Sequence, residues 1–349
     1  MAYTTIDKPS DYFNTKLYTG DGGTQSVTGV GFQPDWTWIK NRGSSDSHNV
    51  YDSVRGVTKY LLPNNNVAED TTSGVTAFNS DGFSVGNNSM TNSNSNNYAS
   101  WNWKAGTSFT NDASATGIGS IDSSGSFNND SGFSIVSYTG GGSNATVKHG
   151  LNTAPSMIIF KRRVGSGWNW TTYHKSMGNN YFMSLNLTNA KSNTSSSTYF
   201  QDTTPTSSVF SIGDSGHLNG NNIIAYCFAE KQGFSKFSSY IGNGITNGTF
   251  VYTGFKPAFV MVKKSAGTGN WFMKDTARDP GNPAELTLAA NSASSAAGWG
   301  TGDDIDLLSN GFKMRDDTAS INTSGDVYIY MAFAENPFVA SNFNAATAR

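Results

Sequence analysis

The chain has 349 residues, of which 36% are hydrophobic and 14% are charged, and its net charge is −2. A single hydrophobic core rarely grows beyond about 250–300 residues, so this length favours two or three domains. The low charge argues against a disordered, self-repelling chain, and the lack of a basic stripe argues against nucleic acid as a partner. A composition rich in Ser, Thr, Asn and Gly predicts an all-β protein with many turns.

The first segment, residues 1–14, is polar and lacks the apolar stretch of a secretory signal. No run of about 18 apolar residues occurs later in the chain either, so membrane insertion is not expected. Because this segment precedes the repeats described below, we interpret it as an anchor to a larger assembly.

Three landmarks recur in the same order along the rest of the chain, which indicates an internal repeat. The first is an aromatic residue followed two positions later by a glycine, at Tyr18, Tyr138 and Tyr240. The second is a proline that opens an apolar strand, where no ladder donor is lost, at Pro34, Pro155 and Pro257. Each apolar run ends in a lysine, interpreted as the point where a buried strand emerges into solvent, at Lys40, Lys161 and Lys263.

The third landmark is a closing strand over residues 98–104, 223–230 and 328–335, in which equivalent positions carry Trp103, Phe228 and Phe333. Short strands of alternating apolar and polar residues, separated by Gly, Asn and Ser turns, are typical of sandwiches and barrels. The predicted fold is therefore all-β, with three tandem β-sandwich units that are jelly-roll-like or lectin-like.

The landmarks place the three units at residues 15–106, 131–232 and 233–349. Residues 107–130 are rich in Ser, Gly, Thr and Asn and are predicted to be a linker. The connection between the second and third units is much shorter. We therefore expect the first unit to sit apart and the other two to form one rigid body.

Residues able to perform catalysis are few and scattered. Nucleophilic catalysis needs a base beside a nucleophile, and the candidate bases are four histidines in non-equivalent places, His48, His149, His174 and His217. No Gly-x-Ser-x-Gly, His-Glu-x-x-His or P-loop motif occurs. Cys227, the single cysteine, lies in an apolar run and is predicted to be buried and inert. The sequence thus predicts no enzyme activity, no catalytic residue and no cofactor.

An acidic cluster in the third unit allows two interpretations. Asp303, Asp304 and Asp306 could supply oxygen ligands to calcium, or they could be turn residues that hydrogen-bond the backbone. The first two units lack the cluster and no EF-hand spacing is present. The turn interpretation is therefore preferred, and no metal site is assigned.

Tryptophans beside Gly-rich loops are the candidate contacts for a ligand or partner. An aromatic face can stack on a sugar ring while asparagine bonds its hydroxyls, and Tyr and Trp are enriched at interfaces. The residues that fit this pattern are Trp168, Asn169, Trp170, Asn270 and Trp271. The alternative interpretation is that these side chains alternate into the sandwich core.

Several segments together resemble a recurring element of tailed-phage virion proteins from marine and cyanobacterial phages, of the tail-fibre-like kind. The resemblance covers nearly the whole chain and is carried by residues 18–36, 53–56, 79–83, 101–106 and 332–338. It implies a component of a phage particle and transfers no catalytic residue.

The resemblance leads to three functional hypotheses. The first is a tail-fibre or adhesin-type subunit that is made in the host cytoplasm and exposed on the virion. It would bind other virion proteins and host surface polysaccharide, and it would form a homo-oligomer with a trimer favoured. The second is a capsid decoration, cement or connector protein with a purely architectural role. The third is a polysaccharide-degrading tailspike, which requires a pair of carboxylates in one groove.

Overall fold

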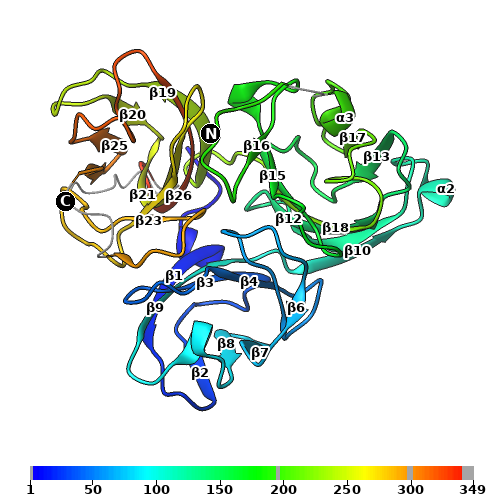
Figure 1. The fold of residues 1–349 in the computed structure, drawn as a ribbon, viewed down its shortest axis with the longest axis horizontal. Coiled ribbons are helices and arrows are strands. Elements are labelled where there is room, and N and C mark those ends of the chain that lie inside the picture. The colour runs from blue at the N-terminus through cyan, green and yellow to red at the C-terminus, as the bar shows by residue number, and fades with distance from the viewer. Residues whose placement is uncertain (1–2, 194–196, 297–301, 340–349) are drawn as a thin grey trace.

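The protein forms three lobes around a common centre (Figure 1) in a computed structural model that describes residues 3–193, 197–296 and 302–339. Each lobe pairs a large sheet that faces the centre with a small sheet on the outside, and the predicted all-β fold is confirmed. We call the lobes unit 1 (strands β1–β9), unit 2 (β10–β18) and unit 3 (β19–β26). Among the described residues, no helix has the length and apolar character needed to cross a membrane.

Unit 1 begins with a 3-10 turn, η1 (Pro9–Asp11). Its large sheet has the strand order β1 (Phe13–Thr19), β9 (Asn97–Trp103), β3 (Trp36–Asn41) and β4 (Asn49–Asp52). Its small sheet has the order β2 (Gln25–Thr28), β8 (Gly82–Val85) and β7 (Val75–Asn79). A two-stranded ribbon and a short helix complete the unit: β5 (Lys59–Tyr60), β6 (Asp70–Thr71) and α1 (Ser89–Asn92).

Unit 2 has a seven-stranded large sheet, in the order β10 (Thr107–Asn111), β11 (Ser123–Asn128), β12 (Phe133–Thr139), β18 (Asn222–Phe228), β14 (Met157–Arg162), β15 (Thr171–His174) and β16 (Met183–Ser184). Its small sheet pairs β13 (Ala145–Lys148) with β17 (Val209–Ile212). The short helical segments are α2 (Ala113–Thr116), η2 (Lys175–Met177) and α3 (Ser197–Phe200).

Unit 3 has a five-stranded large sheet, in the order β19 (Ser235–Ile241), β26 (Val327–Pro337), β21 (Phe255–Lys264), β22 (Trp271–Asp275) and β23 (Leu288–Ala289). Its small sheet has the order β20 (Phe250–Tyr252), β25 (Gly311–Met314) and β24 (Ile305–Leu308).

The three large sheets share one strand order. In each, the opening strand pairs with the closing strand, which pairs with the strand that follows the landmark proline, and a fourth strand comes next. These sets are β1-β9-β3-β4, β12-β18-β14-β15 and β19-β26-β21-β22. The same order of four strands thus occurs in all three units.

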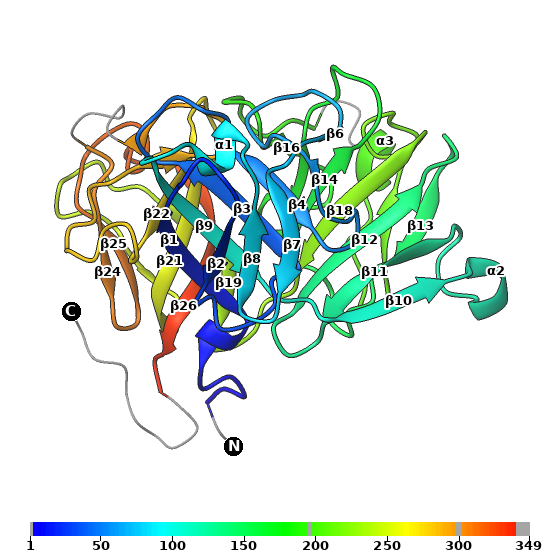
Figure 2. The same ribbon diagram turned by 90° about the horizontal axis from the view of Figure 1, so that it is seen from below.

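The expectation of a linker over residues 107–130 is wrong, because this segment forms β10, α2 and β11 and extends the large sheet of unit 2 (Figure 2). Two aromatic residues within the polar stretch explain the difference. Phe109 and Phe127 lie edge to face with ring centroids 5.9 Å apart, and both pack on the core of unit 2. The polar composition of residues 107–130 therefore gave no indication of the two amphipathic strands, β10 and β11.

A single hydrophobic core joins all three units, so unit 1 does not sit apart as expected. Side chains alternate along each closing strand between this shared core and the unit's own sandwich. In β18, the shared core takes Ile224, Tyr226 and Phe228, and the sandwich of unit 2 takes Ile223, Ala225 and Cys227. Both faces of the strand are therefore buried, and the prediction of a buried Cys227 is confirmed.

The three aromatic residues that align in the closing strands meet one another at the centre. Ring centroids lie 6.4 Å apart for Trp103 and Phe228, 5.6 Å for Trp103 and Phe333, and 6.0 Å for Phe228 and Phe333. Edge-to-face pairs at these distances stabilise beyond the area they bury. Equivalent residues from the three units thus form the middle of one core.

The aromatic-glycine landmark closes each sandwich at its tip. Each landmark tyrosine donates its hydroxyl to the backbone oxygen of the residue that precedes a buried asparagine. The bonds run from Tyr18 to Thr91, from Tyr138 to Leu218 and from Tyr240 to Ile321. The landmark glycine packs against that asparagine's backbone, and a Cβ at Gly20 would lie 2.2 Å from the Ser93 oxygen. A larger residue has no space there, which explains the recurring Tyr-x-Gly spacing.

The lysines that end the proline-opened strands do not emerge into solvent. Lys40, Lys161 and Lys263 are each 0% exposed. Their ammonium groups donate to backbone oxygens of the following hairpin loop, and two of them also reach the preceding unit, at Asn66 and Thr188. Burial lowers the pKa of all three lysines to about 8. These carbonyl contacts make burial tolerable for a charged group.

The described part of the N-terminal segment packs on the molecule. Ile6 lies in the shared core, Thr4 donates its hydroxyl to the Gln232 oxygen at 2.8 Å, and Tyr3 donates to the Gly254 oxygen at 2.7 Å. Gly233, with φ of 75°, lies where a Cβ would be 2.8 Å from Thr4. The described part of residues 1–14 is therefore a strap between unit 1 and unit 3.

Replacing Phe228 by alanine should lower the free energy of unfolding by about 3–5 kcal/mol, because the cavity opens where all three units meet. Near-ultraviolet circular dichroism during urea unfolding should show one transition in both proteins. Phe250→Ala, at a side chain that is 44% exposed, is the control and should change stability by about 0.5 kcal/mol or less. Separate transitions for the units would contradict a shared core.

Candidate functional site

The predicted contact residues are used inside the molecule. Trp170 and Trp271 are buried in the shared core, and each indole N–H donates to a backbone oxygen of the preceding unit. Trp170 donates to Leu62 at 2.8 Å, and Trp271 donates to Ser184 at 3.1 Å. The core interpretation of these two tryptophans is therefore correct, with the added finding that they join the units.

The predicted asparagines also serve local structure. The Asn169 side-chain oxygen accepts from Asn186 at 2.8 Å, and the Asn270 oxygen accepts from Asn291 at 2.7 Å. Asn186 and Asn291 in turn accept from the backbone N–H of the adjacent tryptophan. These amide pairs fix the start of β15 and β22. Their hydrogen bonds are made within the protein and are not directed at an outside ligand.

Trp168 is the predicted tryptophan that stays partly exposed. The Arg162 guanidinium lies 4.1 Å from the ring centroid, and the His217 ring lies edge to face at 5.1 Å. Cation–π packing of this kind occupies one face of an indole ring. The five predicted residues thus divide between separate contacts and do not form one site.

His48 occupies the place in unit 1 that Trp170 and Trp271 occupy in units 2 and 3. It is fully buried and lies near the backbone of Ala289 and Ser292 of unit 3, although the geometry gives its Nε2 no hydrogen bond within the described part of the chain. Its Nδ1 accepts from the Trp38 indole at 2.8 Å. Each unit thus has one ring side chain at this position that faces a neighbouring unit: Trp170 faces unit 1, Trp271 faces unit 2 and His48 faces unit 3.

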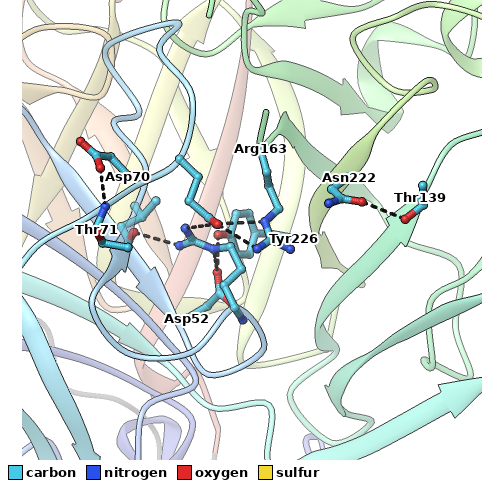
Figure 3. A network of polar contacts seen from close by, with 10 residues as sticks. Asp52, Asp70, Thr71, Thr139, Arg163, Asn222 and Tyr226 are labelled. Atoms are coloured by element: carbon cyan, nitrogen blue, oxygen red, sulfur yellow. Dashed lines mark hydrogen bonds and ion pairs between the residues drawn. The ribbon is translucent and has the colours of Figure 1, made fainter. Parts of the chain in front are cut away.

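A buried charged cluster fixes the boundary between units 1 and 2 (Figure 3). Arg55 pairs with Asp52, and Asp52 also accepts the Tyr226 hydroxyl of unit 2 at 2.7 Å. Glu69 bridges Arg55 at 3.1 Å and Arg163 of unit 2 at 2.8 Å. Burial would raise the pKa of Glu69, but bonds from Arg163 and the charge of Arg55 hold it below its usual value.

The equivalent position in unit 3 repeats this arrangement. Arg278 pairs with buried Asp275, which accepts the Trp101 indole N–H of unit 1 at 3.1 Å. Unit 2 differs, because its equivalent residues are His174 and Met177. His174 Nε2 donates to the Tyr330 oxygen of unit 3 at 3.1 Å. Each unit therefore reaches the closing strand of the next unit through the last residue of its fourth strand.

Three buried histidines hold the same neutral tautomer. The Nδ1 atoms accept N–H bonds from Trp38 in His48, from Leu151 in His149 and from Ser176 in His174. Burial lowers the pKa of His149 and His174 to about 4 and that of His48 well below its usual value. Protonation would remove an accepted hydrogen bond in each case.

The acidic cluster of unit 3 does not assemble a cation site. Asp303 accepts the Thr318 hydroxyl at 2.8 Å, and Asp306 lies 3.5 Å from Arg315. Burial raises the pKa of Asp303 and of Asp304, which disfavours their charged forms. Over the described residues, no group of three or more His, Cys, Asp or Glu side chains is placed to hold a metal ion.

A groove at the boundary of units 2 and 3 gathers polar and aromatic side chains that the sequence did not indicate. Its volume is about 420 Å³, and its walls include Tyr3, Lys175, Glu230, Lys236 and Tyr252. We call it the tyrosine groove. Glu230 accepts from Lys175 at 2.6 Å and from Lys236 at 2.7 Å. One feature of the sequence could have indicated this groove. Of the equivalent strands β2, β13 and β20, only β20 has exposed aromatic residues, Phe250 and Tyr252.

A larger, open groove of about 690 Å³ lies along β10–β12 and is lined mainly by Ser and Thr hydroxyls. Its carboxylates, Asp112 and Asp122, accept backbone N–H bonds from the first turn of α2. Tyr138 lines the groove, but its side chain is buried within unit 2. This surface has hydroxyl groups without an exposed aromatic face.

Replacing Arg55 by methionine, the residue that unit 2 has at the equivalent position, should destabilise the protein by about 3–5 kcal/mol, because Asp52 would remain buried and unpaired. Urea unfolding measures the change. Adding Asp52→Asn should recover at least half of the loss, since asparagine can still accept from Tyr226. Arg315→Met, at an exposed pair, is the control, with a change of about 0.5 kcal/mol or less. Equal effects of the two single variants would contradict this assignment.

Acid should destabilise the protein through His174. Because the folded pKa is about 4 and the unfolded value is about 6.5, the unfolded state binds the proton more readily. Stability is therefore expected to fall as pH drops from about 6.5 to about 4, by on the order of 3 kcal/mol for this residue. Lys175 and Glu230, which also face this ring, are unchanged in His174→Gln.

Urea midpoints at several pH values test this expectation. Glutamine can donate to Tyr330 and accept from Ser176 without titrating, so the His174→Gln variant should lose less stability than the wild-type protein over that interval. Parallel pH profiles for the two proteins would contradict the role of His174.

Comparison with known proteins identifies one family. A family model described as a domain of unknown function (DUF7483) matches residues 8–337, and therefore spans all three units. No curated protein matches the chain. The chain belongs to the DUF7483 family, the domain of unknown function whose model covers it from η1 to the end of β26.

Proposed function

We propose that this chain is a structural component of a phage particle, of the tail-fibre or adhesin type, which binds other virion proteins and host surface saccharide. The observation that carries the proposal is that the buried ionisable side chains hold the three lobes together. The resemblance of the landmark segments to tailed-phage virion proteins supplies the biological setting.

The histidines illustrate why cohesion is favoured over catalysis. A general base needs a lone pair within reach of a substrate proton. In His48, His149 and His174 the Nδ1 lone pair accepts an N–H bond in a buried position. Asp52 and Asp275 are likewise paired with buried arginines. These buried histidines and Asp–Arg pairs stabilise one rigid body, as expected of a structural component of a particle.

The outer surface of unit 3 supports contact with other proteins. Exposed large apolar side chains lie close together in its sequence, from the end of β19 to the end of β20, at Ile241, Ile245, Phe250 and Tyr252. Apolar groups exposed together are a mark of interaction sites. In this proposal the protein is made in the host cytoplasm and exposed on the virion, and it forms a homo-oligomer with a trimer favoured.

A capsid decoration or cement protein is the alternative, and the same apolar side chains favour it. A polysaccharide-degrading tailspike has less support. The hydroxyl-lined groove has two carboxylates, Asp112 and Asp122, but bonds from Ser114 and the Ala115 backbone lower the pKa of Asp112. A glycosidase acid needs a raised pKa.

Immunogold labelling of purified particles with antibody against the chain tests the proposal. We expect label on the particle surface, and we expect the chain to remain with particles through a density gradient. Recovery of the chain only in the soluble fraction of the lysate would contradict it. Light scattering of the purified chain measures the oligomeric state.

Loss of the gene product separates the two structural roles. A fibre or adhesin is expected to reduce adsorption to host cells with intact particles, whereas a cement protein is expected to lower the temperature at which particles release DNA. Release of reducing ends from host polysaccharide by the purified chain would instead favour the tailspike.

A further inference from the structure

We propose that the tyrosine groove is a binding site for a saccharide that carries a carboxylate. The groove lies where the N-terminal strap, η2 of unit 2, the connection between β18 and β19, and β20 of unit 3 come together. Its volume of about 420 Å³ falls within the range of about 300–1,000 Å³ that is usual for ligand pockets. The inference names the ligand class for the attachment role proposed above and depends on that role for its biological meaning.

Two tyrosines form the aromatic side of the groove. Tyr3 donates its proton to the Gly254 oxygen at 2.7 Å, so in its 3.5 Å contact with Tyr252 the hydroxyl of Tyr252 is the donor. A Cβ at Gly254 would lie 2.4 Å from the Tyr3 hydroxyl, and the missing side chain therefore makes space for this pair. Tyr252 is 53% exposed, and its ring offers an apolar face next to a hydroxyl.

The charged side chains that line the groove carry a net positive charge. Glu230 lies between the ammonium groups of Lys175 and Lys236, and two cations beside one anion leave one positive charge in excess. An ammonium group has three N–H donors, and the bond to Glu230 uses one from each lysine. These lysines are part exposed, so a ligand carboxylate can accept from both of them.

The chemistry of the two sides selects the ligand. A pyranose ring has an apolar C–H face that packs on an aromatic ring, and its hydroxyls suit Gln232 and the tyrosine hydroxyls, which line the same groove. A carboxylate on that ring would compensate the excess charge, because charge-assisted bonds are the stronger ones. A hexuronate unit combines these features, whereas a neutral hexose lacks the anion and a free anion lacks the ring.

Units 1 and 2 provide an internal comparison. The position of Tyr252, one residue after the buried valine that pairs with a phenylalanine, is Thr28 in β2 and Lys148 in β13. The position of Glu230, two residues after the central aromatic, is Ala105 in unit 1 and Glu335 in unit 3, where Glu335 pairs with Lys256. The exposed tyrosine is therefore particular to the boundary of units 2 and 3, whereas the glutamate position recurs in unit 3.

Isothermal titration calorimetry of the full chain at low salt tests the inference, with trigalacturonate as the acidic probe. Maltotriose serves as the neutral probe and acetate as the anion without a ring. We expect trigalacturonate to bind and the other two to give no heat. Lys236→Gln and Tyr252→Thr should each weaken binding about tenfold or more. The first variant removes a charge-assisted bond, and the second removes the aromatic face.

Two matched controls keep the test specific. Lys148→Gln removes an equal charge at the equivalent strand of unit 2, and Phe250→Ser removes an exposed aromatic side chain two residues from Tyr252. Neither residue lines the groove, and both variants should bind like the wild-type protein. Unchanged melting temperatures show that each variant is folded.

Four results would overturn the inference: no binding of trigalacturonate to the folded chain, equal binding of maltotriose, displacement by acetate at equal concentration, or full affinity in folded Lys236→Gln and Tyr252→Thr. Any of these, found together with immunogold label on particles, removes the saccharide site and leaves the virion assignment intact. Binding of trigalacturonate by a chain that is absent from particles would remove the virion assignment and leave the saccharide site intact.

Discussion

The contact among Trp103, Phe228 and Phe333 sets the rest of the structure, because it requires every unit to bury its inner sheet against the other two. In an ordinary sandwich, one face of each sheet can meet water. Here the closing strands have two buried faces, so a unit on its own would expose the apolar side chains of a whole sheet. The lobes are consequently parts of one folded body.

Apolar packing alone does not fix how the lobes are turned relative to one another, and directional contacts supply that information. Two boundaries have an indole N–H that donates to a backbone oxygen of the preceding unit, and every boundary has a residue at the end of a fourth strand that bonds to the next closing strand. A buried polar group without its partner is costly. These contacts therefore favour the observed arrangement over alternatives in which the same apolar faces meet in another register.

The sequence predicted the all-β fold correctly, because periodic apolar residues and turn glycines are local signals. It aligned Trp103 with Phe228 and Phe333, but spacing cannot tell whether aligned residues touch. The solvent-exposed ends expected at Lys40 and its equivalents were wrong, because a strand that ends at a neighbouring lobe looks the same locally as one that ends in water. The same ambiguity left two interpretations open for Trp170 and Trp271, of which burial in the core is the correct one. The tyrosine groove was missed because its side chains come from segments far apart in the chain, from Tyr3 to Tyr252.

Carrying three related lobes on one polypeptide has a consequence for stoichiometry. In a trimer of identical subunits, any substitution appears three times, and a surface feature cannot be confined to one face. A single chain has no such restriction, so Tyr252 can stand in one lobe while Thr28 and Lys148 stand in the others. The molecule keeps a threefold-like packing of its inner sheets and yet has a front and a back, because the tyrosine groove lies at one boundary of units.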